Sequence, residues 1–163
     1  GGISIFSDRP FKIGDRVRVG GEDGHVEEIG MRSTRIRTLD GTKVTIPNSI
    51  VANTNVENVS DENARKIKMA IGVTYDTSDA KMQKAMDIVR NIILKNKDTD
   101  DKSLVWFDEF GDFALHIKIF YWIKNLDNII PVKNDINMAI KKQFAKAKID
   151  MAFPTQTLEI VKK

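Results

Sequence analysis

The pattern of hydrophobic residues changes near residue 62, and this change constrains the fold more than any other feature of the sequence. Residues 10–60 are rich in Gly, Val, Ile and Thr and carry turn signals every few residues, which is typical of short strands. Residues 64–160 contain two stretches with the period of amphipathic helices. A chain of 163 residues is long enough for two domains with cores of their own. The sequence therefore predicts one domain at residues 10–62 and a second at residues 63–163.

The first domain is predicted to be a small β-barrel. Val17 and Val19 alternate with two arginines, which is the two-residue period of a half-buried strand. The dipeptide Asp40-Gly41 between two β-branched runs predicts a hairpin. The expected strands lie at residues 16–19, 25–29, 34–38, 43–46 and 56–59. Five short strands in so few residues predict a five-stranded barrel of the SH3 or Sm type.

Glycine is expected to set the turns of this domain, because it adopts positive φ angles without steric cost. Gly20 and Gly21 form one such signal. Pro47 has no N–H group to donate, so we expect it to end the fourth strand. The residues expected to determine turns are Gly14, Gly24, Gly30, Asp40 and Gly41.

The second domain combines strands and helices. Each of its two helices is predicted from apolar residues spaced three and four apart, which form one buried stripe. The expected elements are a strand at residues 67–73, a helix capped by Thr77 or Ser78, strands at 104–110 and 113–122 joined at Gly111-Asp112, a helix capped by Asp127 or Asn128, and a strand at 157–161. The order β-α-β-β-α-β is that of ferredoxin-like domains.

The sequence contains no recognisable catalytic or metal-binding constellation. The absence of cysteine excludes a disulfide framework, a thiolate metal site and a cysteine nucleophile. His25 and His116 fall in different predicted domains, and neither has further ligands at a suitable spacing. No run approaches the roughly 18 apolar residues of a membrane span. We therefore expect no enzymatic activity, no cofactor and no metal ion in this chain.

Basic residues gather on one predicted strand of the barrel. Arg35 and Arg37 lie two positions apart and therefore point to the same side, with Arg32 just before them. This surface is either a solvated outer face or a docking site for a phosphate, a lipid headgroup or an acidic protein loop. The net charge of +3 is small, and basic and acidic residues are mixed along the chain. This pattern does not favour nucleic-acid binding.

Four segments in the first domain together resemble the signature of the small-conductance mechanosensitive channel (MscS) family. They occur in the order and at the spacing of that family, and the joint match is more specific than any single segment. Two later segments, at residues 71–76 and 153–157, are also similar to family segments. The four segments are Arg9–Asp15, Gly24–Ile29, Arg37–Gly41 and Ile46–Ser49.

The resemblance implies a fold and a function. In that family an Sm-like β domain follows the pore-lining helix, and a ferredoxin-like α/β domain comes next. Seven copies form a hollow cytoplasmic cage, and membrane tension opens the pore to release ions and small osmolytes in hypo-osmotic shock. The resemblance thus implies a homo-heptamer on the cytoplasmic side of the inner membrane, held there by preceding helices to which residues 1–9 would connect.

The same resemblance suggests which residues matter and leaves alternatives open. Arg32, Arg35 and Arg37 become candidates for contacts that affect gating, and Pro47 and Asn48 become candidates for an interface loop between subunits. Two alternative functions are an RNA-binding Sm-like module and a small-ligand sensor on the ferredoxin-like half. The first needs aromatic residues for stacking, and the barrel half has only Phe6 and Phe11.

Overall fold

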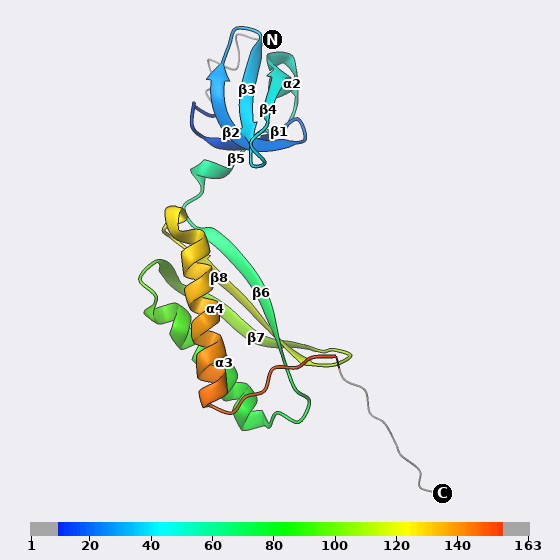
Figure 1. Ribbon diagram of the computed structural model, residues 1–163, viewed down its shortest axis with the longest axis vertical. Helices are drawn as coiled ribbons and strands as arrows, with labels where there is room; N and C mark the ends of the chain where they lie inside the picture. Colours follow the sequence, from blue (N-terminus) through cyan, green and yellow to red (C-terminus); the bar gives the residue numbers. More distant parts are fainter. Residues whose placement is uncertain (1–9, 155–163) are drawn as a thin grey trace, which may run out of the picture. The chain divides into compact units, whose positions relative to one another are not determined.

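The computed structural model describes residues 10–154, and the chain divides into two compact units between Glu62 and Asn63. Figure 1 shows a unit built mainly of strands and a unit in which two long helices accompany a sheet. Each unit has its own hydrophobic cluster. The units are therefore described separately.

The first unit is a single antiparallel sheet with a short helix. The strands follow one another in the sheet in the order β4-β3-β2-β1-β5, so the last strand returns to pair with the first (Figure 1). The elements are β1 (Arg16–Val19), β2 (Glu22–Ile29), β3 (Ser33–Thr38), β4 (Lys43–Pro47), helix α2 (Asn48–Asn53), β5 (Glu57–Asn58) and the 3-10 turn η1 (Val59–Asp61).

Alternation along the strands builds the core of this unit. Val17 and Val19 are buried while Arg18 between them is exposed, as the period of a one-sided strand requires. The buried cluster removes apolar side chains from water, and each such side chain contributes about 1.5–3 kcal/mol. Its members are Phe11, Val17, Val19, Val26, Ile36, Ile46 and Val51.

The turns of the first unit use glycine at positive φ. Gly20 and Gly21, with φ of +59° and +81°, connect β1 to β2. Gly41, with φ of +90°, closes the connection between β3 and β4, where its N–H donates to the Thr38 carbonyl at 2.9 Å. Gly14 has φ of +95° and precedes β1. Asp40 lies in the same connection as Gly41.

The expectation that Gly24 sets a turn needs correction. Gly24 lies inside β2, between Val17 of β1 and Thr38 of β3. A Cβ atom at this position would lie 2.3 Å from the carbonyl oxygen of Arg37, closer than any contact allows. Glycine is required here because two backbones approach closely, not because the chain turns. Gly30 does stand at a connection, where its N–H donates to the Ser33 carbonyl at 2.8 Å.

The second unit packs two helices on one face of a three-stranded antiparallel sheet with the order β6-β8-β7 (Figure 1). The elements are β6 (Arg65–Val73), α3 (Asp79–Lys95), β7 (Thr99–Phe110), β8 (Leu115–Ile123), the 3-10 turn η2 (Leu126–Asn128) and α4 (Ile129–Lys146). Ser78 caps α3 by accepting a hydrogen bond from the Lys81 N–H at 3.2 Å. β7 begins at Thr99, five residues before the predicted start, and β8 begins at Leu115 rather than at residue 113.

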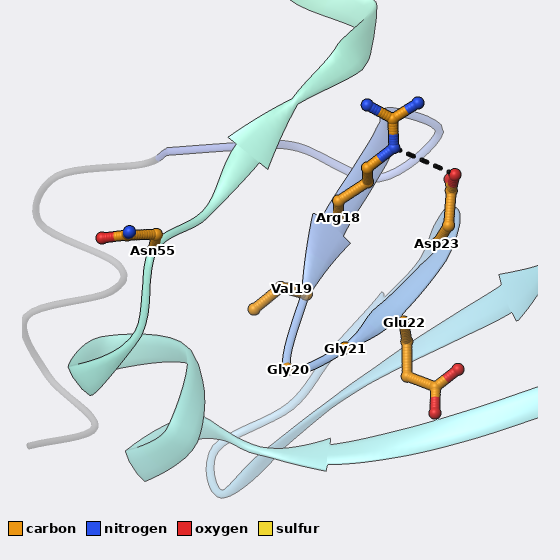
Figure 2. Close-up of a pocket in the computed structure, with 7 residues that line it drawn as sticks. All are labelled: Arg18, Val19, Gly20, Gly21, Glu22, Asp23 and Asn55. Carbon is orange, nitrogen blue, oxygen red and sulfur yellow. Dashed lines mark hydrogen bonds and ion pairs between the residues drawn. The ribbon is translucent and has the colours of Figure 1, made fainter.

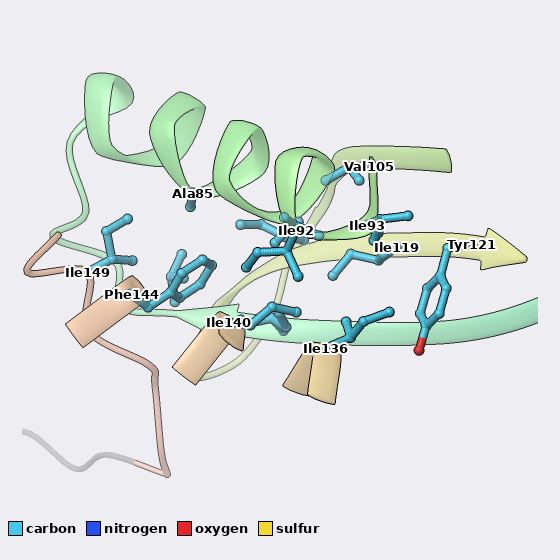
Figure 3. Close-up of a cluster of buried hydrophobic side chains, with 14 of the residues drawn as sticks. Ala85, Ile92, Ile93, Val105, Ile119, Tyr121, Ile136, Ile140, Phe144 and Ile149 are labelled. Atoms are coloured by element: carbon cyan, nitrogen blue, oxygen red, sulfur yellow. The ribbon is translucent and has the colours of Figure 1, made fainter. Parts of the chain in front are cut away.

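The predicted helical stripes form the core of the second unit (Figure 3). Val89 and Ile93 of α3 and Ile140 and Phe144 of α4 are buried against the inner face of the sheet. Tyr121 of β8 is fully buried with them, and its hydroxyl has no hydrogen-bond partner within residues 10–154. Burial raises the pKa of the Tyr121 hydroxyl to about 12.

The last predicted strand, at residues 157–161, lies outside the described residues. Just before it, Met151 bridges Val73 at the outer edge of β6, and the Ala152 N–H donates to the Gly72 carbonyl at 2.9 Å. Within residues 10–154, none of the helices combines the length and the apolar character that crossing a membrane would require.

Candidate functional site

The outer face of the first sheet carries the predicted arginines Arg35 and Arg37. A β-bulge in β2 determines which carboxylates these arginines contact. Val26 of β2 pairs with Ile36 of β3, but Glu28 pairs with Arg35, so Glu27 is an extra residue in β2. In a regular strand, consecutive residues point to opposite faces. The bulge removes this alternation, and Glu27 and Glu28 are both exposed beside the arginines.

Each arginine of β3 has its own carboxylate. The guanidinium of Arg37 donates from Nε to Glu27 Oε1 at 2.8 Å and from NH2 to Glu27 Oε2 at 3.2 Å. Arg35 NH1 donates to Glu28 Oε2 at 3.2 Å. The hydrogen bonds from Arg37 lower the pKa of the Glu27 carboxyl, and the same bonds raise the pKa of Arg37. These two arginines are therefore ion-paired within their own sheet.

Arg32 differs from the other two arginines. It is exposed on the connection between β2 and β3, and within residues 10–154 no carboxylate lies at ion-pair distance from its guanidinium. Its backbone carbonyl accepts a hydrogen bond from the Asn48 N–H at 2.8 Å. Of the three predicted arginines, Arg32 thus offers the least compensated positive charge.

Asn48 lies inside the unit, at the start of α2. Its Nδ2 donates to the Gly30 carbonyl at 2.9 Å, and its Oδ1 accepts from the Thr34 hydroxyl at 2.9 Å. Asn48 is 2% exposed and Thr34 is 0% exposed, so the bond between them is shielded from water, whereas the bond to Gly30 is partly buried. Together with the backbone bond to Arg32, they fasten the connection between β2 and β3 to the end of β4. Pro47 ends β4 directly before this residue.

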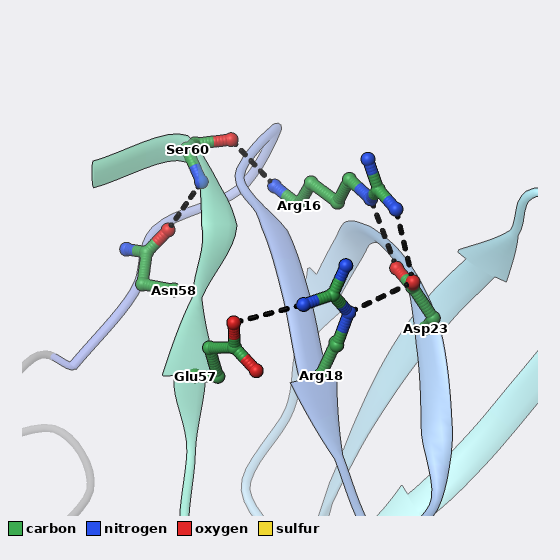
Figure 4. Close-up of polar contacts among 6 residues, drawn as sticks. All are labelled: Arg16, Arg18, Asp23, Glu57, Asn58 and Ser60. Atoms are coloured by element: carbon green, nitrogen blue, oxygen red, sulfur yellow. Dashed lines mark hydrogen bonds and ion pairs between the residues drawn. The ribbon is translucent and has the colours of Figure 1, made fainter. Parts of the chain in front are cut away.

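A second charged network was not predicted from the sequence (Figure 4). Arg16 holds Asp23 through two hydrogen bonds, from Nε at 2.9 Å and from its terminal nitrogen at 3.0 Å. Arg18 donates to the same carboxylate at 3.1 Å and to Glu57 at 2.8 Å. The hydrogen bond from Arg16, followed by that from Arg18, lowers the pKa of Asp23 to about 2. The network ties β1, β2 and β5 together.

An open pocket of about 290 Å³ lies beside this network (Figure 2). Its lining includes Arg18 and Asp23, which already pair with each other. No group of three or more metal-binding side chains is found within residues 10–154. The side chains that line the pocket therefore supply no cluster of three metal ligands among the described residues. Its lining residues are Arg18, Val19, Gly20, Gly21, Glu22, Asp23 and Asn55.

The two end strands of the first sheet present unpaired edges. In the described part of the chain, β4 pairs only with β3, and β5 pairs only with β1. An open edge exposes backbone N–H and C=O groups that can pair with another chain.

Two family models match the chain. The model described as the mechanosensitive ion channel β-domain matches residues 1–61, and the model described as the C-terminal region of the mechanosensitive ion channel MscS matches residues 67–151. The second match alone covers more than half of the chain.

Curated proteins and solved structures agree with these matches. The chain is 41% identical to the small-conductance mechanosensitive channel MscMJ and 40% identical to the large-conductance channel MscMJLR, both of Methanocaldococcus jannaschii. These alignments cover 99% and 96% of this chain but only 47% and 45% of the relatives, so the chain spans about half of their length. The closed-state crystal structure of Helicobacter pylori MscS superposes with a TM-score of 0.85 at 27% identity, over 99% of this chain and 64% of that one. The chain therefore belongs to the MscS family of mechanosensitive ion channels and corresponds to the β-domain and the C-terminal domain of its members.

Proposed function

We propose that this chain forms the cytoplasmic vestibule of a tension-gated ion channel whose membrane helices belong to the rest of the parent protein. The observation that carries the proposal is the succession of both family models along the chain, in channel order. Relatives that extend beyond this chain are named mechanosensitive channels. In this role the chain is a structural part of a channel in the inner membrane, on its cytoplasmic side, and not an enzyme.

The strand orders support the finer description of the two folds. In the first unit the fifth strand returns to the first, which is the pairing that bends a five-stranded sheet toward an Sm-like barrel. In the second unit the described order β6-α3-β7-β8-α4 supplies five of the six elements of a ferredoxin-like domain. Residues 151 and 152, near the end of the described chain, pair with the edge of β6.

The proposed assembly is a homo-heptamer in which the first units stand side by side. Each copy offers the edge of β4 and the edge of β5, so one copy can meet the next in a head-to-tail ring. Such a ring encloses a cavity below the pore. The cavity filters ions and small osmolytes by the size of its openings and by the charge of its walls.

Electrical recording from the full-length parent protein tests this proposal. The protein is expressed in bacterial spheroplasts that lack their own mechanosensitive channels, and pressure is applied to excised patches. We expect unitary currents that appear above a threshold pressure and are absent from patches with the empty vector. Silence from a protein shown to reach the membrane would mean that the family fold serves another purpose in this parent.

The RNA-binding alternative has little support in the first unit. Phe11 is the one aromatic residue within residues 10–62, and it is 5% exposed, so it offers no ring for a base to stack on. The small-ligand alternative concerns the second unit and leads to the inference below.

A further inference from the structure

The outer face of the second sheet, opposite the two helices, carries a cluster of lysines and aromatic rings. Side chains on this face alternate with the buried residues of the core, as the period of a strand requires. They come from all three strands of the sheet. We call this surface the lysine–aromatic face; it consists of Lys66, Lys68, Lys102, Trp106, Lys118, Phe120 and Trp122.

The strand register brings these residues into rows. Lys66 of β6 pairs with Trp122 of β8, and Lys68 pairs with Phe120 in the next row. On the other side of β8, Trp106 of β7 stands opposite Lys118. The rings of Trp106 and Phe120 touch edge to face, with centroids 5.0 Å apart. Trp122 follows Phe120 on the same face of β8, and we call the three rings of Trp106, Phe120 and Trp122 the aromatic floor.

Ammonium groups lie over this floor. The Nζ atom of Lys66 is 4.3 Å from the centroid of Phe120 and 5.6 Å from that of Trp122. Lys102 Nζ is 4.6 Å from the centroid of Trp122, and Lys68 Nζ is 5.8 Å from that of Phe120. Cation–π attraction holds a lysine in such a position. Three positive charges are thereby concentrated above two neighbouring rings.

Among the described residues, these three charges have no ion-pair partner. Within residues 10–154, no carboxylate lies at ion-pair distance from the ammonium groups of Lys66, Lys68 and Lys102. Lys118 is different, because its Nζ lies 3.5 Å from Asp108, which also accepts from the Trp106 indole N–H at 2.8 Å. The end of the face near Trp122 is therefore the uncompensated end. Like charges repel one another, and an anion placed among the three ammonium groups is attracted by all of them.

We propose that the lysine–aromatic face binds nucleotides. Their phosphates would neutralise Lys66, Lys68 and Lys102, and a planar base would stack on a ring that a lysine leaves when it turns toward the phosphate. Two features match this chemistry at once: unpaired cations attract the phosphates, and aromatic faces accept the base. A simple acidic partner would use only the first feature, and an apolar partner only the second.

The two tryptophans of the chain report on this face directly. Trp106 and Trp122 are the only tryptophans in the sequence, and both belong to the lysine–aromatic face. Intrinsic fluorescence, excited at the red edge of the indole band where adenine does not absorb, therefore follows binding without a label. The probe is ADP, titrated into the 163-residue chain at low salt in the absence of divalent cations.

Two ligands and two variants separate nucleotide binding from a general effect of charge. Pyrophosphate has the phosphates without the base, and adenosine has the base without the phosphates. The variant Lys66→Glu/Lys102→Glu reverses two charges on the face. The variant Lys141→Glu/Lys142→Glu makes the same change on the exposed side of α4, outside the face.

We expect saturable quenching by ADP, with an affinity that falls as salt is added. Pyrophosphate and adenosine should each bind at least about tenfold more weakly, and Lys66→Glu/Lys102→Glu should lose at least about tenfold in affinity for ADP. The α4 variant should bind ADP as the wild type does. Circular dichroism checks that both variants are folded.

Several results would overturn the proposal. One is an unchanged fluorescence spectrum, another is an equal response to pyrophosphate and ADP, and a third is an equal loss in both double variants. Self-association of the wild-type chain through this face, with no change in fluorescence when ADP is added, would also refute it. A second copy of the chain would then be the occupant of the face. The experiment uses this chain alone, so its failure leaves the channel proposal untouched.

Discussion

Arg37 of β3 donates two hydrogen bonds to Glu27 of β2. Glu27 faces Arg37 because it is the extra residue of a β-bulge. Arg37 also donates to the Gly41 carbonyl at 3.0 Å, in the connection that leads to β4. Lys43 of β4 lies 3.7 Å from the same glutamate. Glu27 thus joins β2 to β3 through Arg37 and to β4 through Lys43, while Arg37 also holds the turn between β3 and β4.

The charge reversal Arg37→Glu should weaken the first unit and change gating. It places two carboxylates side by side where an ion pair stood, so we expect a lower free energy of unfolding in urea at low salt and a smaller loss at high salt. Arg32→Glu is the matched control, because Arg32 has no ion-pair partner among the described residues. The swap Glu27→Arg/Arg37→Glu should recover part of the loss.

In the full-length channel, Arg37→Glu should shift the pressure threshold relative to wild type, since this sheet lies next to the segment that leads to the pore in the proposed assembly. Patch recording measures the shift. An unchanged threshold, with Arg37→Glu protein present in the membrane, would remove this arginine from the gating proposal and leave it a purely structural role.

The truncation Asn48→Ala should be strongly destabilising. It removes an amide that satisfies the buried Thr34 hydroxyl and the partly buried Gly30 carbonyl, and the Thr34 hydroxyl then stays buried without this partner. Leaving a buried polar group unsatisfied costs about 1–3 kcal/mol, so we expect a loss of about 1–3 kcal/mol in urea unfolding. Asn53→Ala is the control on the same helix, because its amide bonds the Ser49 carbonyl in an exposed position. Equal losses for the two variants would contradict this account.

Local patterns were enough to place most strands and helices. The alternation of Val17 and Val19 and the stripe of α3 each depend on residues close in sequence, so the sequence alone identified them. Helix α2 was missed, because six residues are too few to display a helical period. Gly24 was misassigned, because the close approach of Arg37 depends on how β2 pairs with β3, and the sequence does not show that register.

The site was less predictable than the fold for the same reason. The sequence showed that Arg35 and Arg37 share a face, but their partners depend on a bulge in another strand, which leaves no mark in the sequence. The lysine–aromatic face was missed as well. Its residues alternate with core residues on three separate strands, and only the register of the sheet brings Lys66 next to Trp122.

The substitution Gly24→Ala tests the close approach of β2 and β3. The added methyl group would meet backbone atoms of Arg37, which cannot move aside without shifting the strand. We expect a loss of about 1–3 kcal/mol, as for other overpacked sites, measured by urea unfolding. Gly41→Asn is the contrasting variant, because asparagine tolerates positive φ and no atom lies within 4 Å of the added Cβ. If Gly24→Ala were as stable as Gly41→Asn, β2 and β3 would have to lie further apart than described.

The stability of the first unit should fall in acid through Asp23. The arginines lower the pKa of this carboxyl from 3.8 to about 2 in the folded chain, so the folded state favours the charged form. The resulting stabilisation is complete above the unfolded pKa and is lost as the pH falls from 3.8 to about 2. Because Asp23 is partly exposed, we expect a contribution of about 1–2 kcal/mol.

Urea unfolding at a series of pH values measures this contribution. Asp23→Asn should flatten the profile of unfolding free energy between these two pH values. The control Asp112→Asn removes a carboxylate that forms no ion pair among the described residues, and it should keep the wild-type profile. A wild-type profile that is already flat in this range would show that the arginines do not lower the pKa of Asp23 in solution.

The substitution Tyr121→Phe should stabilise the second unit. The Tyr121 hydroxyl is buried and has no hydrogen-bond partner in the described part of the chain. Its removal keeps the ring in the core and relieves the cost of an unsatisfied polar group. We expect a gain of about 1 kcal/mol in the free energy of unfolding.

Burial raises the pKa of this hydroxyl from 10 to about 12, so the folded state favours the neutral form. Stability should therefore decline as the pH rises above 10 in the wild type, and this part of the decline should be absent in Tyr121→Phe. Tyr75→Phe is the control, because Tyr75 is exposed and its hydroxyl donates to the Gly111 carbonyl. A loss of stability in Tyr121→Phe would reveal a partner for this hydroxyl in solution.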